Sequence, residues 1–276
     1  MVMRASIVVA LLIAFCTSAS AGTVTAPKLA FTKSREPLTK PFQRSASTSE
    51  YLQKLRAAYQ LDEVVRGAAS DYDRVRAMSR WVRTRWEHNG SNEPSKYDPI
   101  TILEEASKGQ RFRCVEYSIV LAAALNSVGV PARVLNLKTV DAETRESGAG
   151  HVVAEAYLRD RRKWVMVDGQ FDVIPMRGTT PLNAVEFQQA LSRGDKRLTV
   201  ATFSGAKADG YFEWVAPYLY YFGTKLDARY DVTTAKDELI LYPVGAKQLA
   251  AFQRRNPMKD KHWTHSLRTF YAAPVR

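Results

Sequence analysis

Residues 150–168 read GHVVAEAYLRDRRKWVMVD. Apolar stretches on either side of the charged segment RDRR (159–162) predict two strands joined by a tight turn, that is, a β-hairpin. A turn of two or four residues places Val153 opposite Asp168. Because His151 lies two residues before Val153, His151 and Asp168 share one face as diagonal neighbours, about 7–8 Å apart at the backbone. The hairpin therefore predicts a hydrogen bond between an imidazole and a carboxylate.

The segment upstream of this hairpin carries a cysteine at a predicted helix start. Residues 114–128 are apolar and rich in alanine, which predicts a largely buried helix that begins at Cys114. A helix N-terminus and nearby cations, here Arg111 and Arg113, lower the pKa of a thiol and favour the reactive thiolate. A histidine oriented by a carboxylate is the base that such a nucleophile needs.

We therefore interpret Cys114, His151 and Asp168 as a catalytic constellation. Each residue also has a structural explanation by itself: a small buried hydrophobe, a core histidine and a turn residue before Gly169. The predicted register of the hairpin favours the catalytic interpretation, because it brings the imidazole and the carboxylate together.

Four sequence blocks carry a resemblance to a known family: RCVEY (113–117), LNSVGVPAR (125–133), GHVVAEAY (150–157) and WVMVD (164–168). Together they resemble the bacterial transglutaminase-like superfamily over about residues 81–171. The resemblance implies an α+β fold with a papain-like core, in which a buried helix carrying the cysteine packs on an antiparallel sheet carrying the histidine and the aspartate. It implies Cys114 as nucleophile, His151 as general base and acid, and Asp168 as the orienting carboxylate.

The approach to the cysteine departs from the family pattern. Many relatives have glycines directly before the cysteine, whereas this chain has QRFR (110–113). The backbone N–H of Cys114 is one natural donor to an oxyanion, since amides at a helix start are unpaired. Gln110 and Trp81 are the candidates for the second donor, and the sequence does not choose between them.

A site of this kind performs acyl transfer through a thioester. The enzyme is a protease or amidase if water resolves the thioester, and a transglutaminase if an amine does. We favour hydrolysis, because water is always available. The alternative, from another class, is a non-catalytic envelope-binding module that retains the transglutaminase-like fold.

The composition and net charge of the chain indicate which kinds of partner it could bind. The chain has 276 residues, 46% of them hydrophobic and 25% charged, with a net charge of +12. This charge favours acidic polymers, such as those of a cell envelope, alongside a protein or peptide substrate. The basic residues are spread along the chain without a nucleic-acid-binding motif. No cofactor is implied, and His262 and His265 lack nearby acidic or thiol residues that would suggest a metal site.

The N-terminus predicts export. Residues 1–21 combine a positive start, an apolar run and the small-residue site ASA (19–21), which is typical of a cleavable signal peptide. Bulky Phe15 disfavours lipidation at Cys16, so we expect cleavage after Ala21 and a secreted or periplasmic protein without a transmembrane span. The mature chain then keeps Cys114 as its one thiol and can form no internal disulfide.

The pattern of apolar and polar residues predicts the domain organisation and the other helices and strands. Residues 22–48 are expected to be a flexible leader, and 49–276 one domain with its core at about 71–175 and a C-terminal elaboration at 176–276. The aromatic-rich segment 211–222 is interpreted as core, with the lining of a substrate groove as the alternative. Helices are expected from Ser49, over 71–86, from Asp98 to Gly109 and over 182–191, and strands over 132–139, 198–203 and 238–242.

Overall fold

A computed structural model of the chain describes residues 26–38, 40–230 and 237–274. The predicted signal peptide over residues 1–21, with Cys16 and the cleavage site after Ala21, lies outside the described residues. Within the described ranges, no helix combines the length and the apolar character that are needed to span a bilayer.

Helices dominate the first half of the described chain, and four of the five lie where the sequence predicts them; the short helix Leu61–Val64 was not predicted. Asp98 accepts a hydrogen bond from the Thr101 amide at 3.1 Å and Pro99 occupies the first turn, so both start the helix as expected. One helix ends at Arg83, three residues before the predicted end at 86, because the Thr84 hydroxyl already donates to a carbonyl of the last turn. The helices are α1 (Glu50–Ala58), α2 (Leu61–Val64), α3 (Asp71–Arg83), α4 (Pro99–Ser107) and α5 (Cys114–Ser127).

A central sheet has the strand order β13–β10–β8–β2–β3–β4 in the described part of the chain. Neighbouring strands are antiparallel except β10 and β13, which are parallel. The predicted antiparallel sheet is thus confirmed around the hairpin and becomes mixed at its far edge. The strands are β2 (Ala132–Lys138), β3 (Gly150–Leu158), β4 (Lys163–Val167), β8 (Tyr221–Lys225), β10 (Glu238–Leu241) and β13 (Lys261–Thr264).

The hairpin β3–β4 has the predicted register. Ala154 pairs with Val167 and Leu158 with Lys163, which leaves a four-residue turn at 159–162. One further step along this ladder places Val153 opposite Asp168. The parity of the turn therefore puts His151 and Asp168 on the same face of the hairpin.

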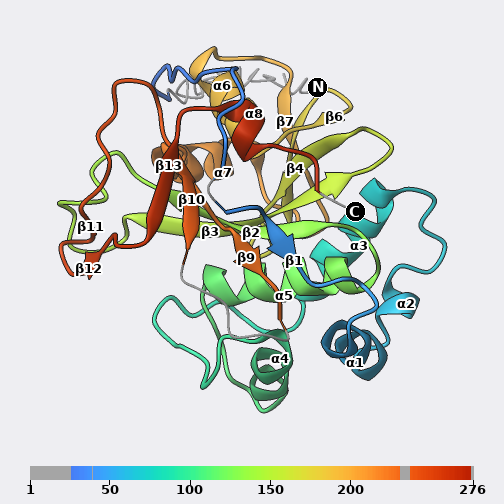
Figure 1. Ribbon diagram of the computed structural model, residues 1–276. Coiled ribbons are helices and arrows are strands. Elements are labelled where there is room, and N and C mark those ends of the chain that lie inside the picture. The colour runs from blue at the N-terminus through green and yellow to red at the C-terminus, as the bar shows by residue number, and fades with distance from the viewer. Residues whose placement is uncertain (1–25, 39, 231–236, 275–276) are drawn as a thin grey trace, which may run out of the picture.

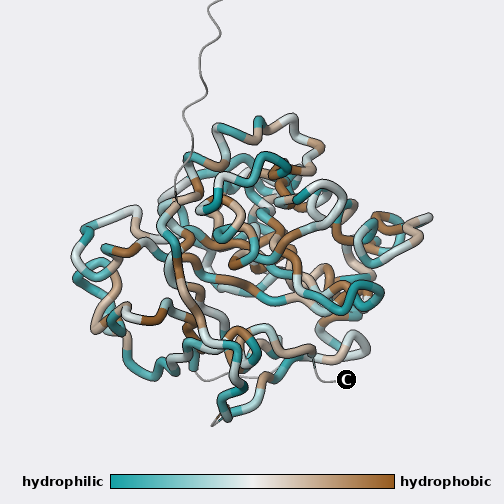
Figure 2. The backbone as a smooth tube through the Cα atoms, turned by 90° about the horizontal axis from the view of Figure 1, so that it is seen from above, coloured by the Kyte–Doolittle hydropathy of each residue, from teal (hydrophilic) through white to brown (hydrophobic). Residues whose placement is uncertain are grey.

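Helices cover both faces of the central sheet (Figure 1). On one face α5 packs against β2 and β3, with α1, α3 and α4 around it. On the other face lie α6 (Ala184–Ser192), α7 (Ala208–Val215) and α8 (Leu267–Phe270). Side chains of β3 alternate between these two cores: Ala154 faces the first and Val153 the second. Figure 2 shows apolar stretches gathered in the interior and hydrophilic loops at the periphery.

The C-terminal half continues the central sheet instead of forming a separate one. Its strand β8 pairs directly with β2. The smaller elements are β5 (Val173–Arg177), β6 (Thr180–Pro181) and β7 (Leu198–Thr202) in a sheet of their own, the 3₁₀ turn η1 (Ala216–Tyr218), the pair β1 (Gln43–Arg44) with β9 (Asp227–Ala228), and the pair β11 (Ala251–Phe252) with β12 (Asn256–Pro257).

The described part of the expected leader, residues 26–38 and 40–48, packs against the body of the protein. The Thr32 amide donates to the His265 carbonyl at 2.8 Å, and the Gln43 amide to the Leu226 carbonyl at 2.7 Å. The side chains of Phe31 and Phe42 pack against the second core. These contacts join residues more than 180 positions apart, so composition alone did not indicate them.

Candidate active site

Cys114 is the first residue of α5, as the sequence predicts. Its side chain is partly buried and forms no disulfide. The Arg113 amide donates to the Glu116 carboxylate at 3.0 Å, which closes the first turn of the helix in the manner of a capping box. The thiol therefore lies at the positive end of a 14-residue helix, where backbone amides are unpaired.

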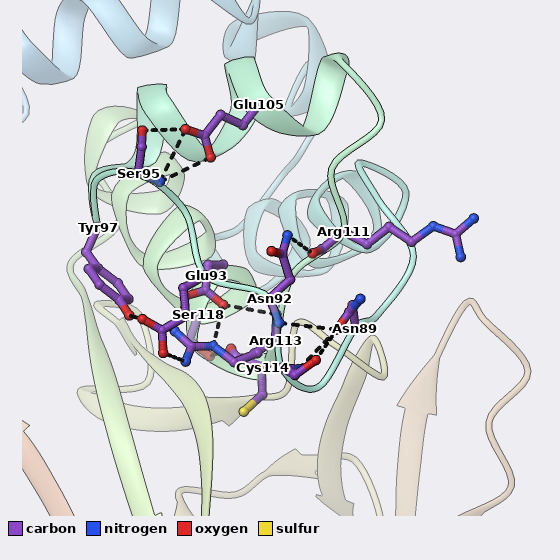
Figure 3. Close-up of polar contacts among 12 residues, drawn as sticks. Asn89, Asn92, Glu93, Ser95, Tyr97, Glu105, Arg111, Arg113, Cys114 and Ser118 are labelled. Carbon is purple, nitrogen blue, oxygen red and sulfur yellow. Dashed lines mark hydrogen bonds and ion pairs between the residues drawn. The ribbon is translucent and has the colours of Figure 1, made fainter. Parts of the chain in front are cut away.

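A loop between α3 and α4 holds the segment that leads to Cys114 (Figure 3). The Asn89 amide donates to the Phe112 carbonyl at 2.9 Å, and the Asn92 side chain donates to the Arg111 carbonyl at 2.8 Å. Glu93 forms an ion pair with Arg113. The Cys114 side chain points away from this polar network (Figure 3), which leaves the thiol on the side of the sheet.

His151 and Asp168 form the hydrogen bond that the hairpin predicts. His151 Nε2 lies 2.7 Å from Asp168 Oδ2, and the two side chains are 2% and 0% exposed. The second carboxylate oxygen accepts from the amides of Gln170 and Phe171 at 3.1 and 3.3 Å. These two amides fix the carboxylate, which in turn fixes the imidazole and leaves Nδ1 as the nitrogen that can face a thiol.

Opposing effects set the protonation of His151. Burial lowers its pKa, because a charged imidazolium loses its hydration. The charge of Asp168 and its hydrogen bond outweigh that loss, and hydrogen bonding to Cys114 and the charge of that thiol act in the same direction, so the pKa of His151 rises to about 9. The contributions of Cys114 indicate that its thiol lies beside the imidazole.

Ser118 ties the helix to the strand that carries the histidine. Its hydroxyl lies 2.9 Å from the Cys114 carbonyl oxygen and 2.8 Å from the Val152 carbonyl oxygen. One hydroxyl thereby bridges the first turn of α5 and the residue after His151. The spacing between thiol and imidazole is thus set by the packing of α5 on β3.

The C-terminal half supplies an aromatic wall to the site, whose individual contacts the sequence did not specify. The Trp214 ring meets the His151 ring edge-on at 4.7 Å between centroids, and Tyr218 lies at 5.9 Å. The Tyr211 hydroxyl donates to Asp168 Oδ2 at 2.9 Å. Segment 211–222 was interpreted as core, and Tyr211 is indeed buried, whereas Trp214 is 38% exposed. The density of aromatic residues was the signal that the sequence offered.

The two candidates for a second oxyanion donor gain no support. The Gln110 side-chain oxygen accepts from the Asn92 amide group at 3.2 Å, and the Trp81 ring packs edge-on against Tyr59 and under the guanidinium of Arg85. The Cys114 amide keeps its place as the first predicted donor. Near the site, Glu116 pairs with Arg113, so it is a structural charge.

Among the residues that the structure describes, no three or more histidine, cysteine, aspartate or glutamate side chains gather in a way that could hold a metal ion. His262 instead lies 3.3 Å from the carboxylate of Asp237. Like His151 and Asp168, these two residues form an imidazole–carboxylate pair. Cys114, however, interacts with His151 and not with this pair.

Residues 59–169 match the family model of the transglutaminase-like superfamily. This match confirms the resemblance drawn from the four blocks. The match contains Cys114, His151 and Asp168. The family match supports a cysteine-based enzyme in general terms. The catalytic roles of the three residues stay predictions. No curated protein matches the chain.

Solved structures show a weaker likeness. A candidate cysteine protease from Cytophaga hutchinsonii has 14% identity and a TM-score of 0.36, covering 56% of this chain and 48% of its own. A TGase has 22% identity and a TM-score of 0.31, covering 44% and 30%. A candidate protease from Parabacteroides distasonis has 12% identity and a TM-score of 0.32, covering 64% and 35%. In each comparison, this chain covers less than half of the length of the solved protein.

Proposed function

We propose that the protein is an exported enzyme that uses Cys114 to cleave a peptide or carboxamide bond of a protein substrate through a thioester. The hydrogen bond between His151 and Asp168, beside a thiol at a helix start, is the observation that carries this proposal. Asp168 holds the imidazole by Nε2, so Nδ1 is available to exchange a proton with the thiol.

The reaction has two halves. The Cys114 thiolate attacks the carbonyl carbon, and the carbonyl oxygen gains the negative charge. When the C–N bond breaks, the His151 imidazolium gives its proton to the leaving amine, and a thioester remains on Cys114. Water then attacks the thioester carbon while His151 takes a proton from it. The C–S bond breaks, the carboxylic acid leaves, and the imidazolium–thiolate pair is restored.

The first half-reaction needs stabilisation of the developing oxyanion. The Cys114 amide lies at the first position of α5, where a helix leaves its N–H groups unpaired. A donor of this kind in an oxyanion hole contributes about 2.7–4 kcal/mol to the transition state. Hydrolysis is the proposed outcome, because water needs no binding site of its own, whereas an amine acceptor does.

The site favours this proposal over a non-catalytic binding module. A module that only kept the fold has no need for a buried carboxylate that accepts from two backbone amides, an imidazole and a phenol. Each of these groups must give up hydration on burial. Their convergence on one carboxylate next to the thiol favours catalysis.

A substrate screen tests the proposal. The mature protein is incubated with casein, with glutamine peptides plus a labelled amine, and with cell-envelope peptides. Mass spectrometry of the enzyme then seeks an acyl adduct on Cys114. We expect an adduct with at least one donor, release of a new carboxylate, and loss of both in Cys114→Ala and His151→Ala.

His262→Ala is the matched control, because it removes a partly buried histidine that also contacts an aspartate. It should retain activity. Incorporation of the labelled amine without carboxylate release would reassign the enzyme as a transglutaminase. The complete absence of an adduct, together with a thiol that reacts no faster than free cysteine, would overturn the proposal.

A further inference from the structure

Asp168 has a partner that the three-residue constellation does not include. Tyr211, the fourth residue of α7, donates its hydroxyl hydrogen to Asp168 Oδ2 at 2.9 Å. The same oxygen receives the bond from His151 Nε2 at 2.7 Å. A buried phenol and the imidazole thus share one carboxylate oxygen.

We infer that Tyr211 is a positioning residue of the active site, which sets the orientation of Asp168 and limits its pull on the His151 proton. This inference rests on the proposed function, since it concerns the same thiol and imidazole. It also gives the C-terminal half of the chain a role in the site.

The phenol remains a donor at every working pH. Burial raises the pKa of Tyr211 well above its ordinary value, and the charge of Asp168 and the hydrogen bond act in the same direction. Tyr211 is 4% exposed, so water cannot replace its hydroxyl without repacking. Its ring is held by Phe171 at 5.5 Å and by Phe187 at 6.4 Å between centroids, which fixes the direction of the O–H bond.

The sharing of one oxygen has an electrostatic consequence. A hydrogen bond from a neutral donor withdraws charge from the carboxylate, so less of that charge is available to stabilise the imidazolium. Without the Tyr211 hydroxyl, Asp168 should hold the His151 proton more tightly. An imidazolium that is harder to deprotonate is a weaker acid toward the leaving amine.

Other titratable groups also face the imidazole and can influence the pKa of His151. They come from α5, the end of β4, α7, η1 and the segment after α3: Cys114, Asp168, Tyr211, Tyr218 and His88. The pKa of His88 is lowered by burial and then by the charge of His151. In Tyr211→Phe the other four groups, Cys114, Asp168, Tyr218 and His88, are unchanged, so a shift in the titration of His151 reports the lost hydroxyl.

The test measures alkylation of Cys114 by iodoacetamide between pH 4 and 11 in the full-length mature protein, together with an NMR titration of the histidine rings. Neither readout needs a substrate. We expect the alkaline transition, at which the imidazolium loses its proton, to move up by about 0.5–1 pH unit in Tyr211→Phe. Where a substrate is known, kcat should fall by about three- to tenfold with little change in KM.

Tyr271→Phe is the matched control. Tyr271 is also a buried tyrosine whose hydroxyl donates to a buried carboxylate, that of Glu155, at 3.1 Å. It should lose a comparable amount of stability without moving the alkaline transition. If Tyr211→Phe does not fold, Tyr211→3,5-difluorotyrosine keeps the ring and strengthens the donor, and the transition should then move down.

A failure of the proposed role of Tyr211 can be told apart from a failure of the proposed reaction. An unshifted transition in a folded Tyr211→Phe or difluorotyrosine protein would overturn the role of Tyr211, even if acyl transfer at Cys114 were proven. A shifted transition in a protein that forms no acyl adduct would support the role of Tyr211 and reject the proposed reaction.

Discussion

His151 and Asp168 are 17 residues apart in the chain, yet their side chains are joined by a 2.7 Å hydrogen bond. The turn at 159–162 has four residues, and this even number keeps both side chains on the same face of the hairpin. An insertion of one residue in the turn would shift Asp168 to the other face. The geometry of the site therefore depends on the length of a loop at the opposite end of the hairpin.

The carboxylate of Asp168 should be needed for activity and not only for folding. Asp168→Asn keeps the shape of the side chain but removes the charge that stabilises the imidazolium. We expect the rate of acyl-enzyme formation to fall by about 10²–10⁴-fold, measured by single-turnover kinetics. Asp237→Asn removes the carboxylate beside His262 and should leave the rate near that of the wild type. Equal rates in both variants would contradict the role of Asp168.

Protonation of His151 should couple stability to pH. The pKa of His151 rises from 6.5 to about 9 in the folded protein. A group whose pKa is raised by folding contributes its full stabilisation below the unfolded value and loses it as the pH passes the folded value. The contribution of His151 is therefore complete below pH 6.5 and is lost by the time the pH exceeds about 9.

Urea denaturation at pH 6, 8 and 10 measures this coupling. The difference in unfolding free energy between wild type and His151→Gln should shrink over that series. A difference that stays constant from pH 6 to pH 10 would show that folding does not raise the pKa of His151.

Sequence periodicity was sufficient for the elements that define the predicted site. The alternation in 150–168 and the parity of its turn predict the register of His151 and Asp168, and the apolar run after Arg113 predicts the start of α5. These are local properties, because each depends on residues within one hairpin or one helix. The Asp98 cap was readable for the same reason.

Long-range packing accounts for what the sequence did not predict. Tyr211 reaches Asp168 from 43 residues downstream, and no periodicity specifies which of the aromatic side chains in 211–222 turns toward the site. The docking of the segment around Thr32 onto His265 depends on the same kind of contact. Gln110 and Trp81, the two candidates for a second oxyanion donor, gain no support from their contacts, because spacing along the chain does not specify how the loops pack.

Gly223 in β8 should not tolerate a side chain. A Cβ atom at this position would overlap the carboxylate of Glu238. That carboxylate is 8% exposed and is held by Lys261 at 3.2 Å and by Asn136 at 2.7 Å, so it cannot move freely. Gly223→Ala should therefore lower the free energy of unfolding by about 1–3 kcal/mol.

Gly210 provides the comparison for this substitution. It lies in α7, where an added Cβ meets nothing within 4 Å. Gly210→Ala should raise stability by about 0.5 kcal/mol, since alanine favours a helix over glycine. Chemical denaturation of both variants tests this prediction, and an equal response would show that the Glu238 side chain can move aside for a methyl group at position 223.

The buried ion pair between Arg133 and Glu155 should be costly to break from one side. Arg133 Nη2 lies 2.6 Å from Glu155 Oε2, with side-chain exposures of 8% and 0%. The other carboxylate oxygen accepts from the Ala184 amide and the Tyr271 hydroxyl. Glu155→Gln leaves the guanidinium without a compensating charge, so we expect a loss of about 3–5 kcal/mol in unfolding free energy.

An exposed pair shows whether burial is the cause of that loss. Arg254 and Glu146 are 60% and 72% exposed and lie 2.9 Å apart. Because water and salt screen such a pair, Glu146→Gln should leave the unfolding transition unchanged within error. Equal effects of Glu155→Gln and Glu146→Gln would mean that Arg133 finds another partner or reaches solvent. A large effect of Glu155→Gln alone would show that burial makes this pair, four residues from His151 on β3, important for stability.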